Sequence, residues 1–293
     1  MHQRRAHRTR DVAGLAAAAV LLTFPAVGIA QQAEGTQITV AYERTRDRFH
    51  YRFENPSTFD TVELVPHEFT QTYWADNGWL VMRARLGRFE TEAAATPSRS
   101  TRGDDFDTFF QPSGDVVVSG TTGGISMRSW RVRQSMGIGR KAGIDWTIAY
   151  GYRSDHSDFH PGLKSISHTR PPSSESFMVF TRETTTSRTY GGDIGMARTW
   201  RQGRWRITAE GRAAPIGNGR LSIELPDKYP GQTLVFNAIF AAVEPAVTVA
   251  AGNRWPIAVR IGYARTFSYG GSRQFLRNAV TVGASVGWRS RQP

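Results

Sequence analysis

Hydrophobic and polar residues alternate with a period of two along much of this chain. From 144 to 152 the even positions hold Ile, Trp, Ile, Tyr and Tyr, whereas the odd positions hold Asp, Thr, Ala and Gly. The stretches 205–210, 257–264 and 280–288 repeat this pattern. Because successive side chains of a strand point to opposite faces, each stretch predicts a strand with one apolar face and one face of small, polar or charged residues.

The alternating runs predict an all-β fold of about ten antiparallel strands. The runs are 37–54, 61–74, 79–88, 119–138, 144–153, 186–200, 205–215, 233–251, 256–269 and 274–288. The first run is interrupted by Arg44, Arg46, Asp47 and Arg48, so an eight-stranded barrel with a periplasmic lead-in is an alternative. Pro245 lacks a backbone donor, which predicts a bulge or kink in the eighth run.

Short turns alternate with longer connections between these runs. Tight hairpins containing glycine, asparagine or aspartate are predicted at 76–78, 140–143, 201–204 and 252–254. The connections at the opposite side are mostly longer: 89–118, 154–185 and 216–232, with shorter ones near 55–60 and 270–273. Short turns on one side and long loops on the other are typical of the periplasmic and extracellular sides of an outer-membrane barrel.

Tryptophans gather near the predicted short turns and the C-terminal end. Tryptophan is favoured at a membrane interface, where its ring contacts lipid and its N–H reaches polar groups. The predicted membrane girdle is Trp74, Trp79, Trp146, Trp200, Trp205, Trp255 and Trp288. The sequence therefore predicts a transmembrane, antiparallel, up-and-down β-barrel. A soluble lipocalin-like barrel with its apolar faces turned inward is the alternative.

The N-terminal segment has the pattern of an export signal. Four arginines in residues 4–10 precede an apolar run that ends at Ala30. We expect residues 1–30 to be a cleaved signal peptide and residues 31–293 to form the barrel domain in a Gram-negative outer membrane. The chain has 0 cysteines, which excludes a disulfide framework and thiol chemistry.

The formal net charge is +12, and arginine supplies most of the positive charge. The basic residues are spread along strands and loops instead of forming a cluster, so we expect no nucleic-acid binding. The expected partners are outer-membrane lipid, lipopolysaccharide and the barrel-insertion machinery.

Charges of both signs fall at predicted inward positions and nearly balance. In a narrow barrel such charges should pair into a network. A general diffusion porin needs about 16 strands, so only limited passage of small solutes is compatible. The predicted lumen network is Glu68, Arg83, Arg85, Arg131, Arg133, Asp145, Asp193, Arg206, Glu210, Arg212, Glu244 and Arg260.

Two short motifs place acidic residues and histidine in the predicted loops. The segment 104–107 reads Asp-Asp-Phe-Asp, and 158–160 reads Asp-Phe-His. Side chains two positions apart on an extended chain point the same way, and a carboxylate beside an imidazole can orient it as a base for water.

In these motifs and in its predicted topology the chain resembles the omptins, which are ten-stranded outer-membrane endoproteases with an aspartate pair on one extracellular loop and an Asp-x-His pair on another. The resemblance implies that Asp105 and Asp107 hold the nucleophilic water. It also implies that Asp158 and His160 form the base pair. Here the Asp-x-His motif falls in the third long loop, whereas the family carries it in the fourth, and residues 214–232 contain no histidine.

Other interpretations of these residues stay open at the level of sequence. A divalent metal could be bound by Asp155, His156, Asp158, His160 and His168, although no strong ligand spacing supports it. A Ser, His and carboxylate site of the lipid A-modifying type is a third possibility, but no spacing selects its members. A solvated loop is the simplest interpretation. We therefore expect a non-enzymatic role in envelope structure, surface interaction or limited solute passage, with no cofactor or metal, and an omptin-like protease is the alternative.

Overall fold

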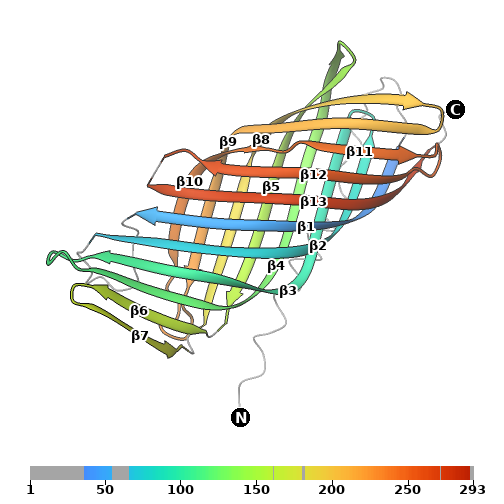
Figure 1. The fold of residues 1–293 in the computed structure, drawn as a ribbon. Helices are drawn as coiled ribbons and strands as arrows, with labels where there is room; N and C mark the ends of the chain where they lie inside the picture. The colour runs from blue at the N-terminus through green and yellow to red at the C-terminus, as the bar shows by residue number, and fades with distance from the viewer. Residues whose placement is uncertain (1–35, 55–65, 161, 180–181, 271, 291–293) are drawn as a thin grey trace. The chain divides into compact units, whose positions relative to one another are not determined.

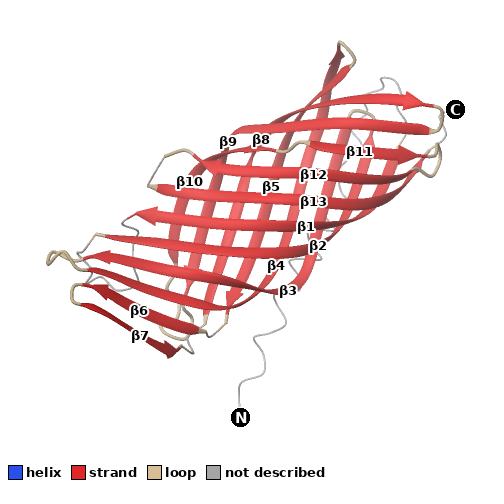
Figure 2. Ribbon diagram, in the orientation of Figure 1, coloured by secondary structure: helices blue, strands red, loops and turns tan. Residues whose placement is uncertain are grey.

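The computed structural model describes residues 36–54, 66–160, 162–179, 182–270 and 272–290. In this part of the chain the strands form one antiparallel sheet that closes into a barrel (Figure 1, Figure 2). The described residues contain no helix that is long and apolar enough to cross a membrane. The predicted signal peptide lies outside the described residues.

The strands follow one another around the barrel, and β13 pairs back with β1. Their bounds are β1 Gln37–Glu54, β2 His67–Leu86, β3 Phe89–Phe110, β4 Val116–Lys141, β5 Ile144–Phe159, β6 Leu163–Thr169, β7 Pro172–Met178, β8 Glu183–Gln202, β9 Trp205–Glu224, β10 Leu234–Val243, β11 Ala246–Ala251, β12 Ile257–Ser268 and β13 Arg273–Arg289. Both β10 and β11 pair with β9 and β12, so they fill one position. The described ring therefore has ten strands, as predicted, and β6 and β7 form a hairpin beside β4.

The predicted turn at 76–78 is wrong, because β2 runs straight through it. Asn77 is a buried inward residue whose Nδ2 donates a hydrogen bond to Asp47 Oδ2 at 3.1 Å. A Cβ on Gly78 would lie 2.5 Å from the hydroxyl of Tyr42 on the neighbouring strand. Asn77 and Gly78 therefore contribute to packing between neighbouring strands and do not form a turn.

The true turn follows β2, where Gly87 has a positive φ of 56°. The predicted loop 89–118 is therefore wrong as well, since it contains all of β3 and the start of β4. The correct strand count arose from two errors that cancel: one strand was divided and another was missed. Strands β5 and β9 extend into the predicted loops 154–185 and 216–232.

The two ends of the barrel differ in their connections. We call the end with the connections after β2, β4, β8 and β11 the turn end, and the opposite end the loop end. The hairpin β6–β7 lies at the loop end and extends the sheet from β4 (Figure 1). The predicted break at Pro245 is confirmed, because β10 stops at Val243, β11 starts at Ala246 and the pairing with β9 shifts register at 240–242.

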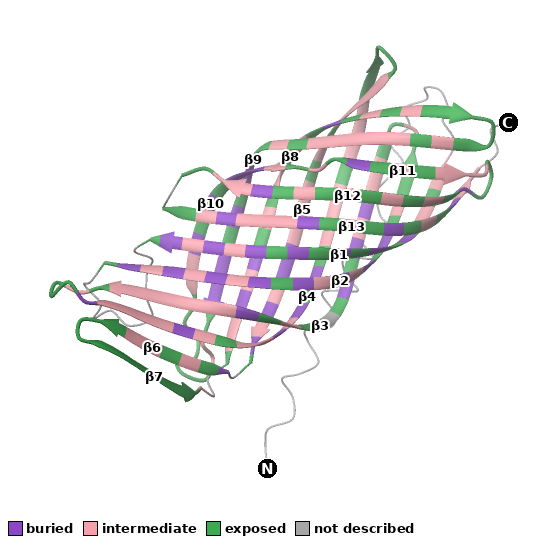
Figure 3. Cartoon of the chain, viewed as in Figure 1, coloured by how far each residue is buried: buried purple, intermediate pink, exposed green. Residues whose placement is uncertain are grey.

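An apolar band covers the outside of the barrel, and buried and exposed positions alternate along the strands (Figure 3). On β8 the exposed Tyr190 and Trp200 are ten residues apart. At about 3.3 Å per residue and a strand tilt of about 40°, they bracket a band about 25 Å tall. Trp130, Tyr152 and Tyr190 form an aromatic belt on the loop side of this band, with ring centroids 4.9 and 6.5 Å apart.

Two of the predicted girdle tryptophans lie elsewhere, because the turn at 76–78 does not exist. Trp74 faces outward far along β2 from its turn, and is 47% exposed. Trp79 points into the barrel and is 0% exposed, with the guanidinium carbons of Arg131 and Arg153 at 4.8 and 5.1 Å from its ring centroid. The others lie near the turn end or the last strand: Trp146, Trp200, Trp205, Trp255 and Trp288.

Side chains fill the described lumen in two zones. The zone nearer the turn end is charged. The zone nearer the loop end is apolar, and its rings stack in contacts such as Phe49 on Tyr73 and Phe53 on Phe236, both at 4.8 Å. We call this zone the aromatic plug: Phe49, Tyr51, Phe53, Phe69, Tyr73, Ala75, Ile125, Met127, Phe159, Leu221, Ile223, Phe236, Ala238 and Phe275.

Replacing Trp79 by Ala should destabilise the barrel by about 3–5 kcal/mol, because the change leaves a cavity beneath two arginines. Trp74→Ala, on the outer face of the same strand, should cost less than about 1 kcal/mol. The temperature at which the heat-resistant folded band disappears on an SDS gel measures both effects. Equal losses in the two variants would contradict the inward placement of Trp79.

Candidate functional site

The charged zone of the lumen is centred on two buried carboxylates of β1, Glu43 and Asp47. Glu43 accepts hydrogen bonds from Arg83 at 2.6 Å and from Arg131 at 2.8 Å. Arg260 lies 3.8 Å from the same carboxylate. Removal of charges from water is costly unless they are paired and hydrogen-bonded, so these contacts explain how the carboxylate is tolerated in the interior.

Further pairs extend the network across the lumen. Glu92 accepts hydrogen bonds from Arg83 and Arg131 at 2.7 and 3.0 Å, and Glu210 accepts one from Arg260 at 2.5 Å. One step toward the loop end, Asp47 accepts a hydrogen bond from Arg277 at 2.7 Å. Arg153 binds Asp155 at 2.7 Å and lies 3.7 Å from Asp47. Ion pairs between acids and arginines of several strands thus connect those strands across the lumen.

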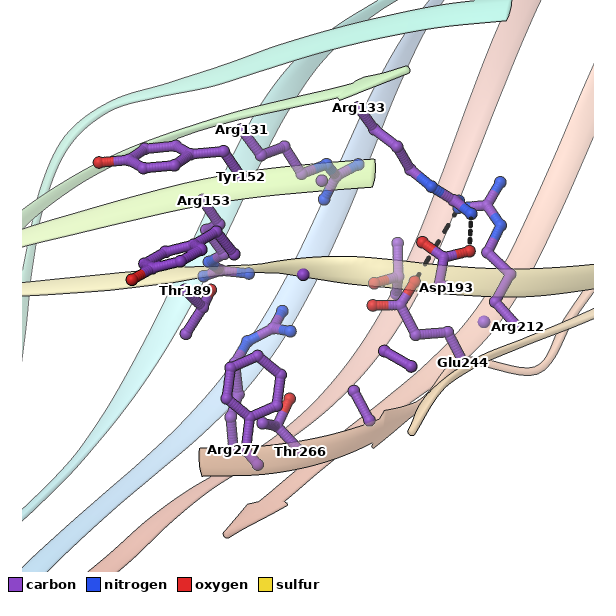
Figure 4. A pocket seen from close by; sticks show the side chains of 18 of the residues that line it. Arg131, Arg133, Tyr152, Arg153, Thr189, Asp193, Arg212, Glu244, Thr266 and Arg277 are labelled. Atoms are coloured by element: carbon purple, nitrogen blue, oxygen red, sulfur yellow. Dashed lines mark hydrogen bonds and ion pairs between the residues drawn. The ribbon is translucent and has the colours of Figure 1, made fainter. Parts of the chain in front are cut away.

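A polar cavity of about 180 Å³ lies within this network. Figure 4 shows Arg133 and Arg212 reaching toward Asp193 and Glu244 at its edge. Arg133 donates a hydrogen bond to Asp193, and Arg212 lies 3.9 Å from Glu244. Since a water molecule takes about 30 Å³ of liquid volume, the cavity can hold a few waters, but the aromatic plug lies between it and the loop end.

Four predicted lumen residues lie outside the network. Glu68 faces outward, where Arg52 donates a hydrogen bond to it at 2.6 Å, because even positions of this part of β2 point away from the lumen. Asp145 is a half-exposed residue paired with Arg140 at 3.5 Å near the turn end. Arg85 and Arg206 also lie near the turn end, where they donate to backbone carbonyls at 3.1 and 3.4 Å.

A carboxylate cluster lies at the loop end above the aromatic plug. Asp105 and Asp107 point inward from β3, and the first residue of β8, Glu183, joins them from across the lumen. Gln71 is directly opposite Asp105 in the pairing of β2 with β3. Its Nε2 donates a hydrogen bond to Glu183 Oε1 at 2.9 Å. Thr185 Oγ1 donates to the same oxygen at 3.0 Å. We call Gln71, Asp105, Asp107 and Glu183 the mouth cluster.

The mouth cluster lies well beyond the apolar band. Glu183 is seven positions past Tyr190, which corresponds to about 23 Å along the strand. Burial raises the pKa of Asp105 well above its usual range, and the charges of Glu183 and Asp107 raise it further. Burial also raises the pKa of Glu183 to about 7. Asp105 and Glu183 lie beside each other and both pKa values are raised, so the pair retains a proton to a higher pH than two free carboxyl groups do.

Two acceptor atoms of the mouth cluster are buried without a hydrogen-bond partner among the described residues. They are Asp105 Oδ1 and Gln71 Oε1, and the Gln71 side chain is only 2% exposed. Lys164 on β6 is the nearby cation that lowers the pKa of Asp105. A cluster of acceptors with unused lone pairs is suited to a donor group that carries positive charge.

The structure places Asp158 and His160 on the other face of the wall. In β5 the buried inward residues are Asp155, Ser157 and Phe159, so the residues between them point outward. Asp158 accepts a hydrogen bond from Thr184 at 2.9 Å, and His160 Nε2 lies 2.8 Å from Ser126 Oγ. The two residue pairs expected from the omptin resemblance therefore do not converge.

The alternative metal site is also not assembled. Asp155 faces the lumen, whereas His156 and Asp158 face outward. His168 on the hairpin forms a hydrogen bond with Asp115 at 2.9 Å instead. Among the described residues, no group of three or more His, Cys, Asp or Glu side chains is arranged to hold a metal ion.

Comparison with known proteins identifies the fold. No protein family model matches the sequence, and no curated protein sequence matches it. The solved structure of the outer membrane protease OmpT from Escherichia coli has a TM-score of 0.60 and 9% identity, and the match covers 90% of this chain and 99% of that chain. The chain has the outer-membrane β-barrel fold.

More distant outer-membrane barrels also match. The translocator domain of autotransporter NalP from Neisseria meningitidis has a TM-score of 0.35 and 12% identity, with 96% of this chain and 95% of that chain covered. Neisserial surface protein A has a TM-score of 0.32 and 9% identity, with 89% and 100% covered. At such identities the similarity establishes the fold of this outer-membrane barrel and not its activity.

Several site residues of the outer-membrane barrel were missed by the sequence analysis. In the lumen these are Glu43, Asp47, Glu92, Arg153 and Arg277, and at the mouth they are Gln71 and Glu183, while Asp155 was considered only as a metal ligand. The alternation of β1 could have identified Glu43 and Asp47 as inward residues. Nothing in the local sequence around Glu183 indicates that it lies beside Asp105, because the contact depends on strands that are far apart along the chain.

Glu43→Ala should destabilise the barrel by about 3–5 kcal/mol, because it removes a buried carboxylate and leaves the partly buried Arg83, Arg131 and Arg260 short of a counter-charge. Glu68→Ala removes an ion pair on the outer face and should cost less than about 1 kcal/mol. Urea unfolding in detergent micelles, followed by tryptophan fluorescence, compares the two variants. A Glu43 variant as stable as the Glu68 variant would contradict the proposed central role of Glu43.

Stability should fall as the pH rises from about 4.5 through about 7, because the folded Asp105–Glu183 pair keeps a proton that the unfolded chain has released. Asp105→Asn should flatten this dependence and make the barrel more stable at pH 8. Asp104→Asn is the matched control, since Asp104 faces outward beside Thr122, and it should keep the wild-type slope. Thermal unfolding measured between pH 4 and pH 9 decides between these outcomes.

Proposed function

We propose that this outer-membrane barrel is a surface-interaction protein that binds positively charged groups at its loop end. The observation that carries the proposal is the mouth cluster, in which three carboxylates and a buried amide oxygen lie close together and two acceptor atoms have no hydrogen-bond partner among the described residues. Ammonium and guanidinium groups are the donors that such acceptors bind best. Basic peptides and polyamines are therefore the ligand class that we propose.

Binding fits the filled lumen better than solute passage does. The aromatic plug lies below the mouth cluster, and the ion-pair network lies below the plug. The ion pairs and the packed rings occupy much of the cross-section in both zones, so passage of a bulky solute would require paired charges and packed rings to separate. A ligand that reaches the mouth would be retained at the surface, which supports a binding role over the porin-like role.

We propose that lipopolysaccharide or another anionic lipid contacts the outer wall. Arg46 and Arg48 of β1 lie over the outward Trp74, with guanidinium carbons 5.2 and 5.4 Å from the ring centroid. Arg44 is exposed on the same face of the strand. Arginines beside an interfacial tryptophan favour the phosphates of lipid headgroups, and this arrangement supports the partner that the sequence suggested.

The second candidate function is an omptin-like endoprotease. Two observations favour it: the fold is similar to that of OmpT, and Asp105 and Asp107 face the mouth. The base would have to be a residue other than the outward His160. His67 is the inward-facing histidine nearest to Asp107. In the pairing of β2 with β3, His67 is opposite Phe109, and Asp107 is opposite Phe69, so the two residues are two positions apart.

An arginine-rich peptide and spermine should bind the folded barrel in detergent micelles, and an all-glutamate peptide should not. Glu183→Gln should weaken binding by tenfold or more, because it removes a charge that the ligand contacts. Since a bound cation displaces the retained proton, affinity should fall by up to about tenfold per pH unit below about 7. Isothermal titration calorimetry between pH 5 and pH 8 measures each quantity.

Asp104→Asn serves again as the matched control and should bind like the wild type. Equal affinities of the Glu183 variant and the wild type would reject the mouth cluster as the binding site. Mass spectrometry of the recovered peptide separates the two functions: an intact peptide supports binding alone. Cleavage that is lost in Asp107→Asn and His67→Ala would establish the protease instead.

A further inference from the structure

A serine and a histidine meet on the outer wall at the loop end, away from the mouth cluster. Ser126 Oγ lies 2.8 Å from His160 Nε2. Asp158 is directly opposite Ser126 in the pairing of β4 with β5, and it shares the outward face with His160 two positions later. Thr184 donates a hydrogen bond to Asp158 Oδ1 at 2.9 Å and so fixes the carboxylate on this face.

Ser126 and His160 meet the first requirement of nucleophilic catalysis, a hydroxyl beside a base. A serine hydroxyl is a weak nucleophile until a base within hydrogen-bond reach takes its proton. His160 Nε2 is at such a distance from Ser126, and it can accept the proton in the tautomer that carries its hydrogen on Nδ1. Asp158 Oδ1 lies 3.7 Å from His156 Nε2, so it acts on the His160 imidazolium only through its negative charge on the same face.

The position of the site indicates where its substrate lies. Along β4 the outward side chains are Trp130 in the aromatic belt, then the exposed Arg128, then Ser126. Four residues correspond to about 13 Å along a strand, or about 10 Å along the membrane normal at the usual tilt. The serine thus lies at headgroup depth, with a cation between it and the apolar band that can bind an anionic group.

We propose that Ser126 and His160, supported by Asp158, form an esterase site that acts on ester-bearing anionic amphiphiles of the outer leaflet. Ser126 Oγ attacks the ester carbonyl carbon, and its proton passes to His160 Nε2. The bond to the alcohol oxygen breaks, and His160 returns the proton to the departing alcohol. Water then attacks the acyl-serine with His160 as base, which releases the carboxylic acid and restores the hydroxyl.

The outer wall offers two matched controls. Thr72 Oγ1 lies 2.8 Å from His50 Nδ1, and Thr186 Oγ1 lies 3.0 Å from His156 Nδ1. Both are outward histidine–hydroxyl pairs, but each uses the more hindered threonine hydroxyl and the other ring nitrogen. Neither pair should react as Ser126 does, although each has the same kind of hydrogen bond.

The experiment treats the folded full-length chain in lipid–detergent micelles with a fluorophosphonate probe and locates the adduct by mass spectrometry. Ser126 should be labelled, and His160→Ala should slow labelling by a factor of 100 or more. Thr72→Ala and Thr186→Ala should label at the wild-type rate. Hydrolysis of a p-nitrophenyl ester and release of fatty acid from phosphatidylglycerol vesicles should follow the same order.

Each outcome bears on the proposal. Absence of the adduct, or equal labelling of the His160 variant, overturns it, provided that the variant keeps the heat-dependent gel mobility of the folded barrel. Hydrolysis of the soluble ester without release of fatty acid overturns the assigned substrate class. Ser126→Ala should bind spermine like the wild type, so failure here leaves the proposed function of the mouth cluster untouched.

Discussion

Closure of the sheet is the constraint on which the rest of this structure depends. Each strand of the ring is paired on both sides, so the backbone hydrogen bonds are satisfied within the wall and no free edge faces lipid. Closure also gives every residue of a strand only two environments, the outside or the lumen. A shift of one position along a strand therefore moves a side chain from the outer face of the barrel into the crowded lumen.

The interior shows what such crowding demands. Ten strands enclose a space that side chains fill, and the chain fills it with paired charges near the turn end and stacked rings near the loop end. Arginines dominate the pairs because the guanidinium group can donate to several carboxylates at once, as Arg83 does to Glu43 and Glu92. The aromatic plug thus separates the charged zone of the lumen from the mouth cluster.

The two-face rule also separates the candidate sites. Asp105 and Asp107 lie on the inner face and meet Glu183, whereas Asp158 and His160 lie on the outer face and meet Ser126 and Thr184. Two motifs that suggested one protease centre in the sequence thus belong to two different environments, the acidic mouth and the outer face of the wall. A barrel fold similar to that of OmpT can carry an acidic cluster on its inner face and a serine–histidine pair on its outer face. Backbone pairing between the strands does not depend on which side chains occupy the loop end.

The sequence by itself determined the all-β barrel and the break at Pro245, because alternation and proline act locally along a strand, whereas its strand count was right only because one divided strand offset one missed strand. It misplaced the turn at 76–78, since Asn77 and Gly78 meet their partners on another strand. Only the tertiary structure decided which charges pair, where Trp79 points and which residues share a face at the loop end. Those contacts join strands distant in sequence, and their register is set by the closed sheet as a whole.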